Sequence, residues 1–400
     1  MKKKISIIGG GSCALMLGCL LNPEIFDISI YERNAKLGRK FLVAGKGGLN
    51  LTHSEPAEDF IKQYTPSFFL ESSFGRFSNY DFIKWMNELG IETFVGSSGR
   101  IFPGKGTKPI EVLNAFLQCI KAHSVKINTK HTWQGFTKNN GLLFNSNNSL
   151  IEVESDYVIF CLGGASWPIT GSKGDWTDYF SKKNIRTIPF QASNCGFRVN
   201  WNPKLMESNH GKILKNISIS CGDKTHFGEV TITRFGLEGS GIYPLSPHIR
   251  KQLNKKGHAL ITIDLKPSFS EAKILEKLKS IADKKNYTNE LKILFSFSQA
   301  QINILKAYNS KEDFFDQKKL AFHLKNMKLT ITETAPIKKA ISTVGGISLD
   351  EIDSYFQLRK LPLHYCIGEM LDYDAPTGGY LLQSCFSMAG FLSDYLNRKS

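Results

Sequence analysis

Apolar positions near the N-terminus follow the order of a β-α-β unit. Residues 4–8 read Lys-Ile-Ser-Ile-Ile, a short β-branched run that predicts a strand buried on both faces. The apolar run from Leu15 to Leu21 predicts a buried helix, and residues 27–31 predict a second strand that ends at Glu32. This order of elements predicts an α/β fold with parallel strands.

In later segments the spacing of apolar residues alternates between that of helices and that of strands. Residues 110–123 predict an amphipathic helix, and residues 125–135 and 142–153 predict a small β-meander. Four β-rich stretches then predict a small barrel: 195–199, 217–220, 229–233 and 259–263. A lysine-rich stretch with helical period follows. We therefore expect three parts, which are a discontinuous α/β domain (1–190 plus 341–400), a barrel-like substrate domain (191–268 plus 328–340) and a helical subdomain (269–327).

The chain is basic, with a formal net charge of +15 from 51 Lys and Arg against 36 Asp and Glu. Such an excess is compatible with a polyanionic partner or an anionic ligand. The basic residues are scattered as pairs, such as Lys255-Lys256, and no dense patch alternates with aromatic residues. We therefore interpret the charge as a lysine-rich solvated surface, which disfavours nucleic acid as a partner.

The cysteines and the N-terminus bear on location. Among the 8 cysteines none forms a C-x-x-C pair, which argues against a zinc ribbon and a dithiol site, and their irregular spacing argues against a disulfide framework.

Three lysines before an apolar stretch imitate a secretory signal, but Gly9, Gly10 and Gly11 would break its helix. No other run reaches the roughly 18 apolar residues of a membrane span. We expect a cytoplasmic protein with no metal site.

A dinucleotide-binding fingerprint joins the first strand to the first helix. The run Gly9-Gly10-Gly11-Ser12-Cys13-Ala14 matches G-x-G-x-x-G/A. Gly9 permits the tight turn, Gly11 lets a pyrophosphate approach the backbone, and Ala14 lets helix and strand pack closely. The helix N-terminus offers free N–H groups to the phosphates. Glu32 at the end of the second strand can accept hydrogen bonds from ribose and would repel a 2′-phosphate, which disfavours NADP here. An ordinary glycine-rich turn is the alternative.

The segment after Glu32 favours FAD over NAD. Residues 37–53 are rich in glycine and carry several cations, so the loop can wrap an extended cofactor with backbone N–H groups and positive charges near its pyrophosphate. The alternative is a flexible surface loop. The candidate cofactor residues here are Arg33, Arg39, Lys40, Gly47 and Asn50.

At this loop the sequence resembles the BaiN-like and aminoacetone-oxidase-like flavoproteins, FAD-dependent members of the glutathione-reductase-type Rossmann superfamily. Lys46-Gly47-Gly48-Leu49-Asn50-Leu51-Thr52-His53 is closer to the aminoacetone-oxidase-like branch. Three further stretches carry the resemblance: 157–168, 231–239 and 365–380. The second departs from the family, which has Ser-Gly-Pro where this chain has Glu238-Gly239-Ser240. The resemblance implies FAD as cofactor, the three-part plan, a glycine turn at Gly163 and Gly164 that contacts FAD, and an adenine contact near Thr132 or Trp133.

The C-terminal motif has a physical interpretation of its own. Residues 365–367 complete a strand, and Gly368 and Glu369 turn out of it. Asp372 can hydrogen-bond the ribitol or phosphate region of the cofactor. Residues 376–379 then open a helix from about Tyr380 to Leu396, whose first N–H groups, near Gly379, Tyr380 and Leu381, would point at the flavin N1 and C2 carbonyl and favour the reduced form. The alternative is a capped helix that merely packs.

The chemistry is less defined than the cofactor. We expect an FAD-dependent oxidoreductase that orients an unidentified small molecule against the flavin, with NAD(P)H or oxygen as a transient partner because no second dinucleotide fingerprint is visible. No catalytic residue can be assigned. Candidates near the flavin are His53, Arg100, Lys105, Arg234, Tyr243 and Tyr380, and each has a structural alternative. The competing hypothesis is a flavin-containing binding protein with an anionic partner such as RNA.

Overall fold

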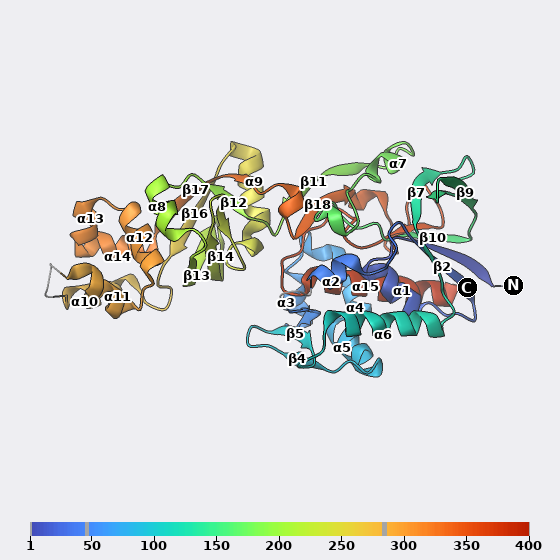
Figure 1. The fold of residues 1–400 in the computed structure, drawn as a ribbon, viewed down its shortest axis with the longest axis horizontal. Helices are drawn as coiled ribbons and strands as arrows, with labels where there is room; N and C mark the ends of the chain where they lie inside the picture. The colour runs from blue at the N-terminus through green and yellow to red at the C-terminus, as the bar shows by residue number, and fades with distance from the viewer. Residues whose placement is uncertain (1, 45–47, 282–285, 400) are drawn as a thin grey trace. The chain divides into compact units, whose positions relative to one another are not determined.

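The computed structural model describes residues 2–44, 48–281 and 286–399, and the chain divides into two compact units (Figure 1). One unit is formed by Met1–Gln191 and Ile341–Ser400, and the other by Ala192–Ala340. The second unit is thus an insertion in the sequence of the first.

The first unit contains a five-stranded parallel sheet in the order β19-β10-β1-β2-β6. Its strands are β1 (Lys3–Ile8), β2 (Phe26–Glu32), β6 (Lys126–Thr129), β10 (Tyr157–Phe160) and β19 (His364–Cys366). The predicted Rossmann-type arrangement is confirmed. The prediction that residues 125–129 belong to a meander was wrong, because β6 pairs with β2 at the edge of this sheet.

Helices and small sheets surround the parallel sheet. The helices are α1 (Ser12–Leu20), α2 (Arg39–Ala44), α3 (Ala57–Ile61), α4 (Glu71–Arg76), α5 (Asn79–Glu88), α6 (Pro109–Ala122), α7 (Thr177–Ser181) and α15 (Tyr380–Lys399). One small sheet is β3 (Thr52–His53), β5 (Arg100–Pro103) and β4 (Thr93–Val95). The others are the meander β7 (His131–Phe136), β8 (Leu142–Ser146) and β9 (Ser149–Val153), and the pair β11 (Thr187–Ser193) and β18 (Ser342–Ile347). Helix α1 packs on α15, so the two ends of the chain share one core.

The second unit contains a closed barrel in the order β12-β15-β14-β13-β16-β17. Its strands are β12 (Phe197–Val199), β13 (Ile213–Cys221), β14 (Lys224–Ile232), β15 (Gly236–Glu238), β16 (Ala259–Asp264) and β17 (Met327–Thr334). Along β16 the side chains of Ala259, Ile261 and Ile263 are buried in alternation with more exposed neighbours, as a strand with one face on a core requires. The predicted inserted barrel is confirmed.

Helices complete the second unit. They are α8 (Pro203–Asn209), α9 (Ser246–Lys256), α10 (Glu271–Lys279), α11 (Tyr287–Phe295), α12 (Gln299–Ala307), α13 (Lys311–Phe315) and α14 (Gln317–Lys325). The described part of the chain also contains short 3-10 helices at Ser67–Leu70, Pro168–Thr170, Tyr243–Leu245, Ile337–Lys339 and Leu349–Glu351. Side chains of Ser270, Ser298 and Asp316 cap helix N-termini by accepting backbone N–H groups. Within the described part of the chain, no helix combines the length and apolarity needed to cross a bilayer.

The central strand β1 offers a test of where the fold is held together. Ile7 on β1 is fully buried, whereas Ile127 on the edge strand β6 is 41% exposed. We expect Ile7→Ala to lower the free energy of unfolding by about 2–5 kcal/mol, through lost burial and a cavity. Ile127→Ala, the matched control, is expected to cost less than about 1 kcal/mol. Urea denaturation followed by fluorescence measures both, and equal losses would contradict the central position of β1.

Candidate functional site

A cavity of about 220 Å³ lies at the carboxyl ends of the parallel strands. The glycine run after β1, the acid that ends β2 and the turn after β10 all line it, as expected for a ligand site of a doubly wound sheet. Pockets that hold a whole cofactor measure roughly 300–1,000 Å³. The cavity therefore has room for one end of a dinucleotide rather than for all of it.

The three glycines of the fingerprint occupy different surroundings. Gly9 has φ +100°, and a Cβ there would lie 2.4 Å from the carbonyl oxygen of Cys161 on the neighbouring strand segment. A Cβ on Gly10 would come within 2.8 Å of Leu37. A Cβ on Gly11 would meet no atom within 4 Å, and Gly11 is the N-cap of α1, with no side-chain cap bonded to the helix. Gly11 therefore leaves the helix N-terminus open to a phosphate.

Glu32 is held by protein donors at the floor of the cavity. Its Oε2 accepts the backbone N–H of Gly10 at 2.8 Å, and its Oε1 accepts the backbone and side-chain N–H groups of Asn34 at 2.7 and 2.6 Å. A carboxylate offers about four lone-pair positions, so one remains for a ribose hydroxyl. Arg33 also lines the cavity and lies 3.6 Å from Asp175.

Trp133 closes the cavity from β7 with an unsatisfied polar group. Its ring packs against Phe160 and Tyr179, with centroids 4.8 and 5.1 Å away, and the residue is 6% exposed. Its Nε1 is buried without a hydrogen-bond partner among the described residues. A buried N–H normally has an acceptor, so this atom is a candidate donor to a bound ligand.

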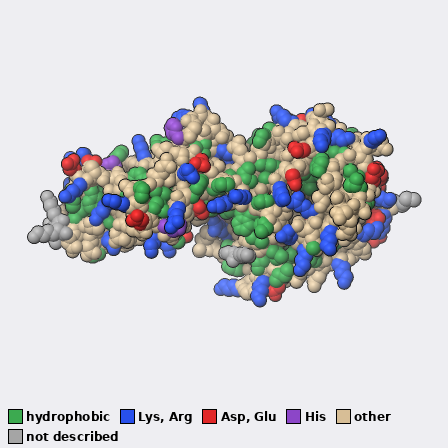
Figure 2. All heavy atoms as spheres, turned by 45° about the horizontal axis from the view of Figure 1, so that its top comes forward, with side chains coloured by type: hydrophobic (Ala, Val, Ile, Leu, Met, Phe, Trp, Pro, Cys, Tyr) green, Lys and Arg blue, Asp and Glu red, His purple; other side chains and the backbone are tan. Residues whose placement is uncertain are grey.

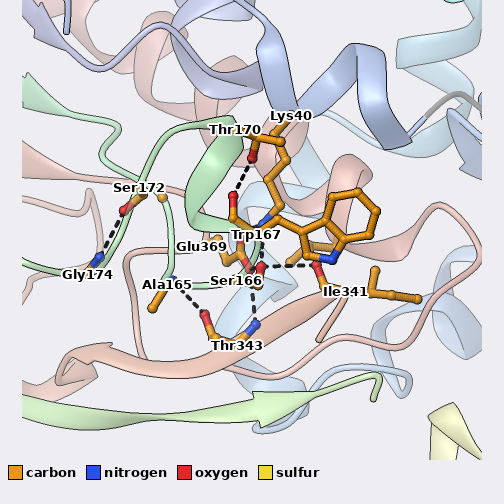
Figure 3. A network of polar contacts seen from close by, with 12 residues as sticks. Lys40, Ala165, Ser166, Trp167, Thr170, Ser172, Gly174, Ile341, Thr343 and Glu369 are labelled. Carbon is orange, nitrogen blue, oxygen red and sulfur yellow. Dashed lines mark hydrogen bonds and ion pairs between the residues drawn. The ribbon is translucent and has the colours of Figure 1, made fainter. Parts of the chain in front are cut away.

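Glu369, from the turn after β19, forms the centre of a polar network at the other wall of the cavity (Figure 3). Its Oε2 lies 2.7 Å from Nζ of Lys40, and its Oε1 accepts the backbone N–H of Thr343 at 3.1 Å. Nζ of Lys40 also lies 2.7 Å from the hydroxyl of Ser166. The side chain of Glu369 is only 9% exposed, so these donors are what allow a charge to stay there.

A second group of unsatisfied polar atoms lies at the start of α15. Gly379 has φ +98°, and a Cβ there would lie 2.5 Å from the backbone of Thr52. Among the described residues, Oγ1 of Thr52, Oδ1 of Asn50 and Oε1 of Gln383 are buried without a hydrogen-bond partner. None of these three residues lines the cavity. Their polar atoms are candidate partners for the polar edge of a flavin ring, as Trp133 is for the other end of an extended FAD.

Three of the candidate catalytic residues come together beside Gly379. The ring of His53 stacks on Tyr380 at 5.2 Å, and Gly378 brings the chain close to Nε of Arg100. Nδ1 of His53 accepts the N–H of Glu55 at 3.2 Å, so Nε2 carries the proton and donates to the carbonyl of Ser98 at 3.0 Å. Both ring nitrogens are thus engaged, which favours a positioning role over that of a base.

Tyr380 packs in the core rather than in the cavity. Its carbonyl accepts the hydroxyl of Tyr64 at 2.7 Å, and its ring lies 4.7 Å from that of Phe60. Burial, followed by the hydrogen bond to the Glu55 carboxylate, raises the pKa of the Tyr380 hydroxyl, so it stays protonated at neutral pH. A contact with a cofactor would therefore come from the backbone at the helix N-terminus.

The other predicted residues occupy varied positions. Arg39, Gly163 and Gly164 line the cavity. Ser12, Cys13, Ala14, Gly368, Asp372 and Leu381 are not among its lining residues, and Gly47 lies outside the described residues. The hydrogen bond with Cys161 and burial raise the pKa of the Cys13 thiol, so this cysteine is an unreactive core group. Lys105 is exposed after β5, and Arg234 and Tyr243 belong to the second unit, so their predicted roles stay predictions.

Several lining residues were not predicted from the sequence. They include Tyr31, Asn34, His131, Gln134, Ser166, Thr170, Ser172, Asp175 and Tyr179. The run Gly171-Ser172-Lys173-Gly174-Asp175 carries a signal that could have been used, because its two glycines mark a close approach of backbone to a ligand. The lining residues on the meander, such as His131 and Gln134, have no comparable pattern in the sequence around them.

Comparisons with known proteins agree with this geometry. A family model described as HI0933-like protein Rossmann domain matches residues 3–393. The ribosomal RNA dihydrouridine synthase of Haemophilus influenzae is 23% identical over 391 residues, covering 96% of each chain. The 3-dehydro-bile acid delta(4,6)-reductase of Clostridium scindens is 22% identical over 413 residues, covering 98% of each chain. A flavocytochrome c3 fumarate reductase in an open conformation has a similar fold, with a TM-score of 0.53 and 12% identity over 99% of this chain and 78% of that one.

The cofactor follows from the family match and the fold. The protein is a flavoprotein, its cofactor is FAD, and it is an FAD-dependent oxidoreductase. The predictions of FAD and of a Rossmann-type domain are confirmed.

The open position of Gly11 gives a direct test of where the cofactor phosphates bind. We expect Gly11→Trp to lower the FAD content of the purified protein at least about tenfold, because the indole would occupy the space in front of the helix N-terminus. Glu32→Ala should also lower it, because Gly10 and Asn34 lose their acceptor. Gly75→Trp is the matched control, since a Cβ at Gly75 on α4 likewise meets no atom within 4 Å. The ratio of flavin to protein absorbance measures all three, and full occupancy in the first two would contradict the site.

Proposed function

The chain belongs to the family of HI0933-like proteins, and from this membership we propose that it is a reductase that saturates a ring carbon–carbon double bond conjugated to a carbonyl group. The resemblance to BaiN-like flavoproteins is thereby confirmed at the level of the family. One observation carries the proposal. Two relatives that span almost the whole chain are named for different substrates, yet both names describe the addition of hydrogen to such a ring, in uridine and in a 3-dehydro-bile acid.

The chain's own residues would hold the cofactor at its two ends. Glu32 and Trp133 would bind the adenosine end, and the open N-terminus of α1 behind Gly11 would bind the pyrophosphate. Asn50 and Thr52 would bind the polar edge of the ring system. Bound FAD supplies the hydride chemistry.

The N-terminus of α15 would stabilise negative charge that develops during the reaction. Its first N–H groups carry a partial positive charge and favour an anionic neighbour. Gly378 and Gly379, with φ +116° and +98°, let the chain approach this point closely. The guanidinium of Arg100, which has no hydrogen-bond or ion-pair partner among the described residues, would hold the substrate carbonyl there. This cation would polarise the carbonyl, so that the far carbon of the conjugated double bond could accept a hydride and the carbon next to the carbonyl a proton from solvent.

The electron donor would dock from solution. The sequence contains one dinucleotide fingerprint, which FAD would occupy, and no second strand-glycine-acid unit that could form a separate nicotinamide domain. We propose NADH or NADPH as a transient donor at the flavin, and oxygen as an unproductive acceptor.

The substrate ring would be part of a free small molecule. Figure 2 shows Lys and Arg side chains spread over the visible face rather than gathered in one band. A uridine in ribosomal RNA is the second candidate, favoured by the net charge of +15 and by the name of the Haemophilus influenzae relative. We propose a cytoplasmic location for either substrate.

Anaerobic reoxidation tests the reaction class. The FAD-loaded protein is photoreduced without oxygen and mixed with a 4,6-dien-3-one steroid or with unmodified ribosomal RNA transcribed in vitro. We expect one of them to restore the flavin absorbance at about 450 nm. Mass spectrometry should show that the same compound has gained two hydrogen atoms. Arg100→Ala should slow this step by about 10- to 100-fold while leaving the FAD content unchanged.

The outcomes separate the candidates. Reoxidation by the steroid alone supports the small-molecule substrate, and reoxidation by RNA alone, weakened by added salt, supports the uridine. Lys121→Ala is the control, because Lys121 is an exposed cation on helix α6 that was not a candidate for the site. A reduced protein that neither compound reoxidises would contradict the proposed reaction.

A further inference from the structure

Strand β5, which lies beside β4 in a small sheet of the first unit (Figure 1), has one buried and one partly exposed face. Ile101 and Pro103 are buried, whereas Arg100 and Phe102 are partly exposed. Successive side chains of a strand point to opposite faces of the sheet. Phe102 therefore lies on the same face as Arg100, with about 7 Å of strand between the two residues.

The strands on either side of β5 continue this face. His53 on β3 pairs with Arg100, and Phe94 on β4 pairs with Phe102. Residues directly opposite each other in an antiparallel pair project from the same side of the sheet. These four residues thus share one face, which we call the Arg100 face, whereas Ile101 projects to the other face and is 2% exposed.

Two phenyl rings form an apolar surface on the Arg100 face. The ring centroids of Phe94 and Phe102 lie 5.7 Å apart, with the ring planes inclined by 28°. Phe94 is 37% exposed, so part of this surface faces solvent. Gly96 lies opposite Arg100, because its N–H donates to the Arg100 carbonyl at 2.7 Å, and a Cβ at Gly96 would lie 3.0 Å from the Phe102 ring. The glycine therefore keeps the position beside the cation and the rings free of a side chain.

The Arg100 face also adjoins both segments proposed to hold the flavin ring. A Cβ at Gly378 would lie 3.7 Å from Nε of Arg100, and a Cβ at Gly48 would lie 3.5 Å from the ring of Phe102. Gly378 shortly precedes α15, and Gly48 is two residues before Asn50, whose Oδ1 has no hydrogen-bond partner among the described residues. The cation and the apolar surface are therefore both next to the place proposed for the flavin.

We infer that Phe102 is a specificity-determining residue, whose ring, together with that of Phe94, binds the apolar part of a fused-ring ketone while Arg100 holds the carbonyl oxygen. The inference rests on the proposed reduction of a conjugated ring and narrows its substrate class. The cation is complementary to the carbonyl oxygen, and the adjacent rings are complementary to a flat apolar molecule. Because the binding free energy of an apolar surface grows with the area that it buries, fused rings gain more here than a single ring does.

Binding to the oxidised protein tests this surface without turnover. The FAD-loaded protein is titrated with a 4,6-dien-3-one steroid and, separately, with cyclohex-2-enone, which carries a conjugated carbonyl on one ring. The change in flavin absorbance gives each Kd. We expect Phe102→Ala to raise the Kd of the steroid about tenfold and that of cyclohexenone less than about twofold. Phe102→Tyr keeps the ring and should leave the steroid Kd within about twofold of the wild type, whereas Phe94→Ala should raise it about threefold.

A ring of equal exposure elsewhere in the first unit provides the matched control. Tyr355 is 38% exposed and stacks on Tyr395 with the ring centroids 3.9 Å apart. At 1.5 Å per residue, Tyr395 lies about 22 Å along α15 from Tyr380. Tyr355→Ala should therefore leave both Kd values unchanged. The FAD content and unfolding temperature of each variant are measured as well, and Phe94→Ala, on the edge strand, carries the test if Phe102→Ala does not fold.

The results separate this inference from the proposed reaction. A steroid Kd that is the same in the wild type, Phe102→Ala and Phe94→Ala would overturn the inference. An equal rise in the Kd of cyclohexenone would also overturn it, as would a wild-type protein that does not bind the steroid. A steroid that binds through Phe102 but is not reduced by the photoreduced protein would support the inference and contradict the proposed reaction.

Discussion

The buried carboxylate of Glu369 joins three separate parts of the chain beside the cavity. Glu369 is 8% exposed, and a charge there is tolerable only because Lys40 and the backbone of Thr343 supply hydrogen bonds at 2.7 and 3.1 Å. These partners come from three parts of the chain, and Lys40 and Glu369 are 329 residues apart. Helix α2, strand β18 and the turn after β19 are therefore joined at this point. Lys40 and Glu369 also line the cavity, so the network supports the site proposed for the cofactor.

Close backbone contacts extend this constraint to the two places proposed for the ends of FAD. At one end Gly9 passes the carbonyl of Cys161 with no room for a Cβ, and at the other Gly379 passes Thr52 in the same way. Between them, helices α1 and α15 share one core, so their N-termini are held by the packing of the whole unit rather than by local loops. A rigid unit of this kind suits a reaction in which binding and orientation are the protein's contribution.

The sequence predicted those parts of the fold whose signals are local. The glycine run with Glu32, the helix from Tyr380 and the barrel strands each carry a pattern in a few consecutive residues, and each is found. Strand β6 was assigned to the wrong sheet because its four residues show no buried alternation and its place depends on pairing with β2. Likewise Lys40 and Glu369 were expected to contact the cofactor singly, but no local pattern reveals that they bind each other.

One cofactor that spans from Glu32 to the start of α15 would join all these features. The most direct test is chromatography of the chromophore released from the purified protein, quantified against the chain. We expect FAD at about one per chain, bound without added reductant or substrate. A protein that carries FMN or no flavin, and does not take up FAD when it is supplied, would contradict it.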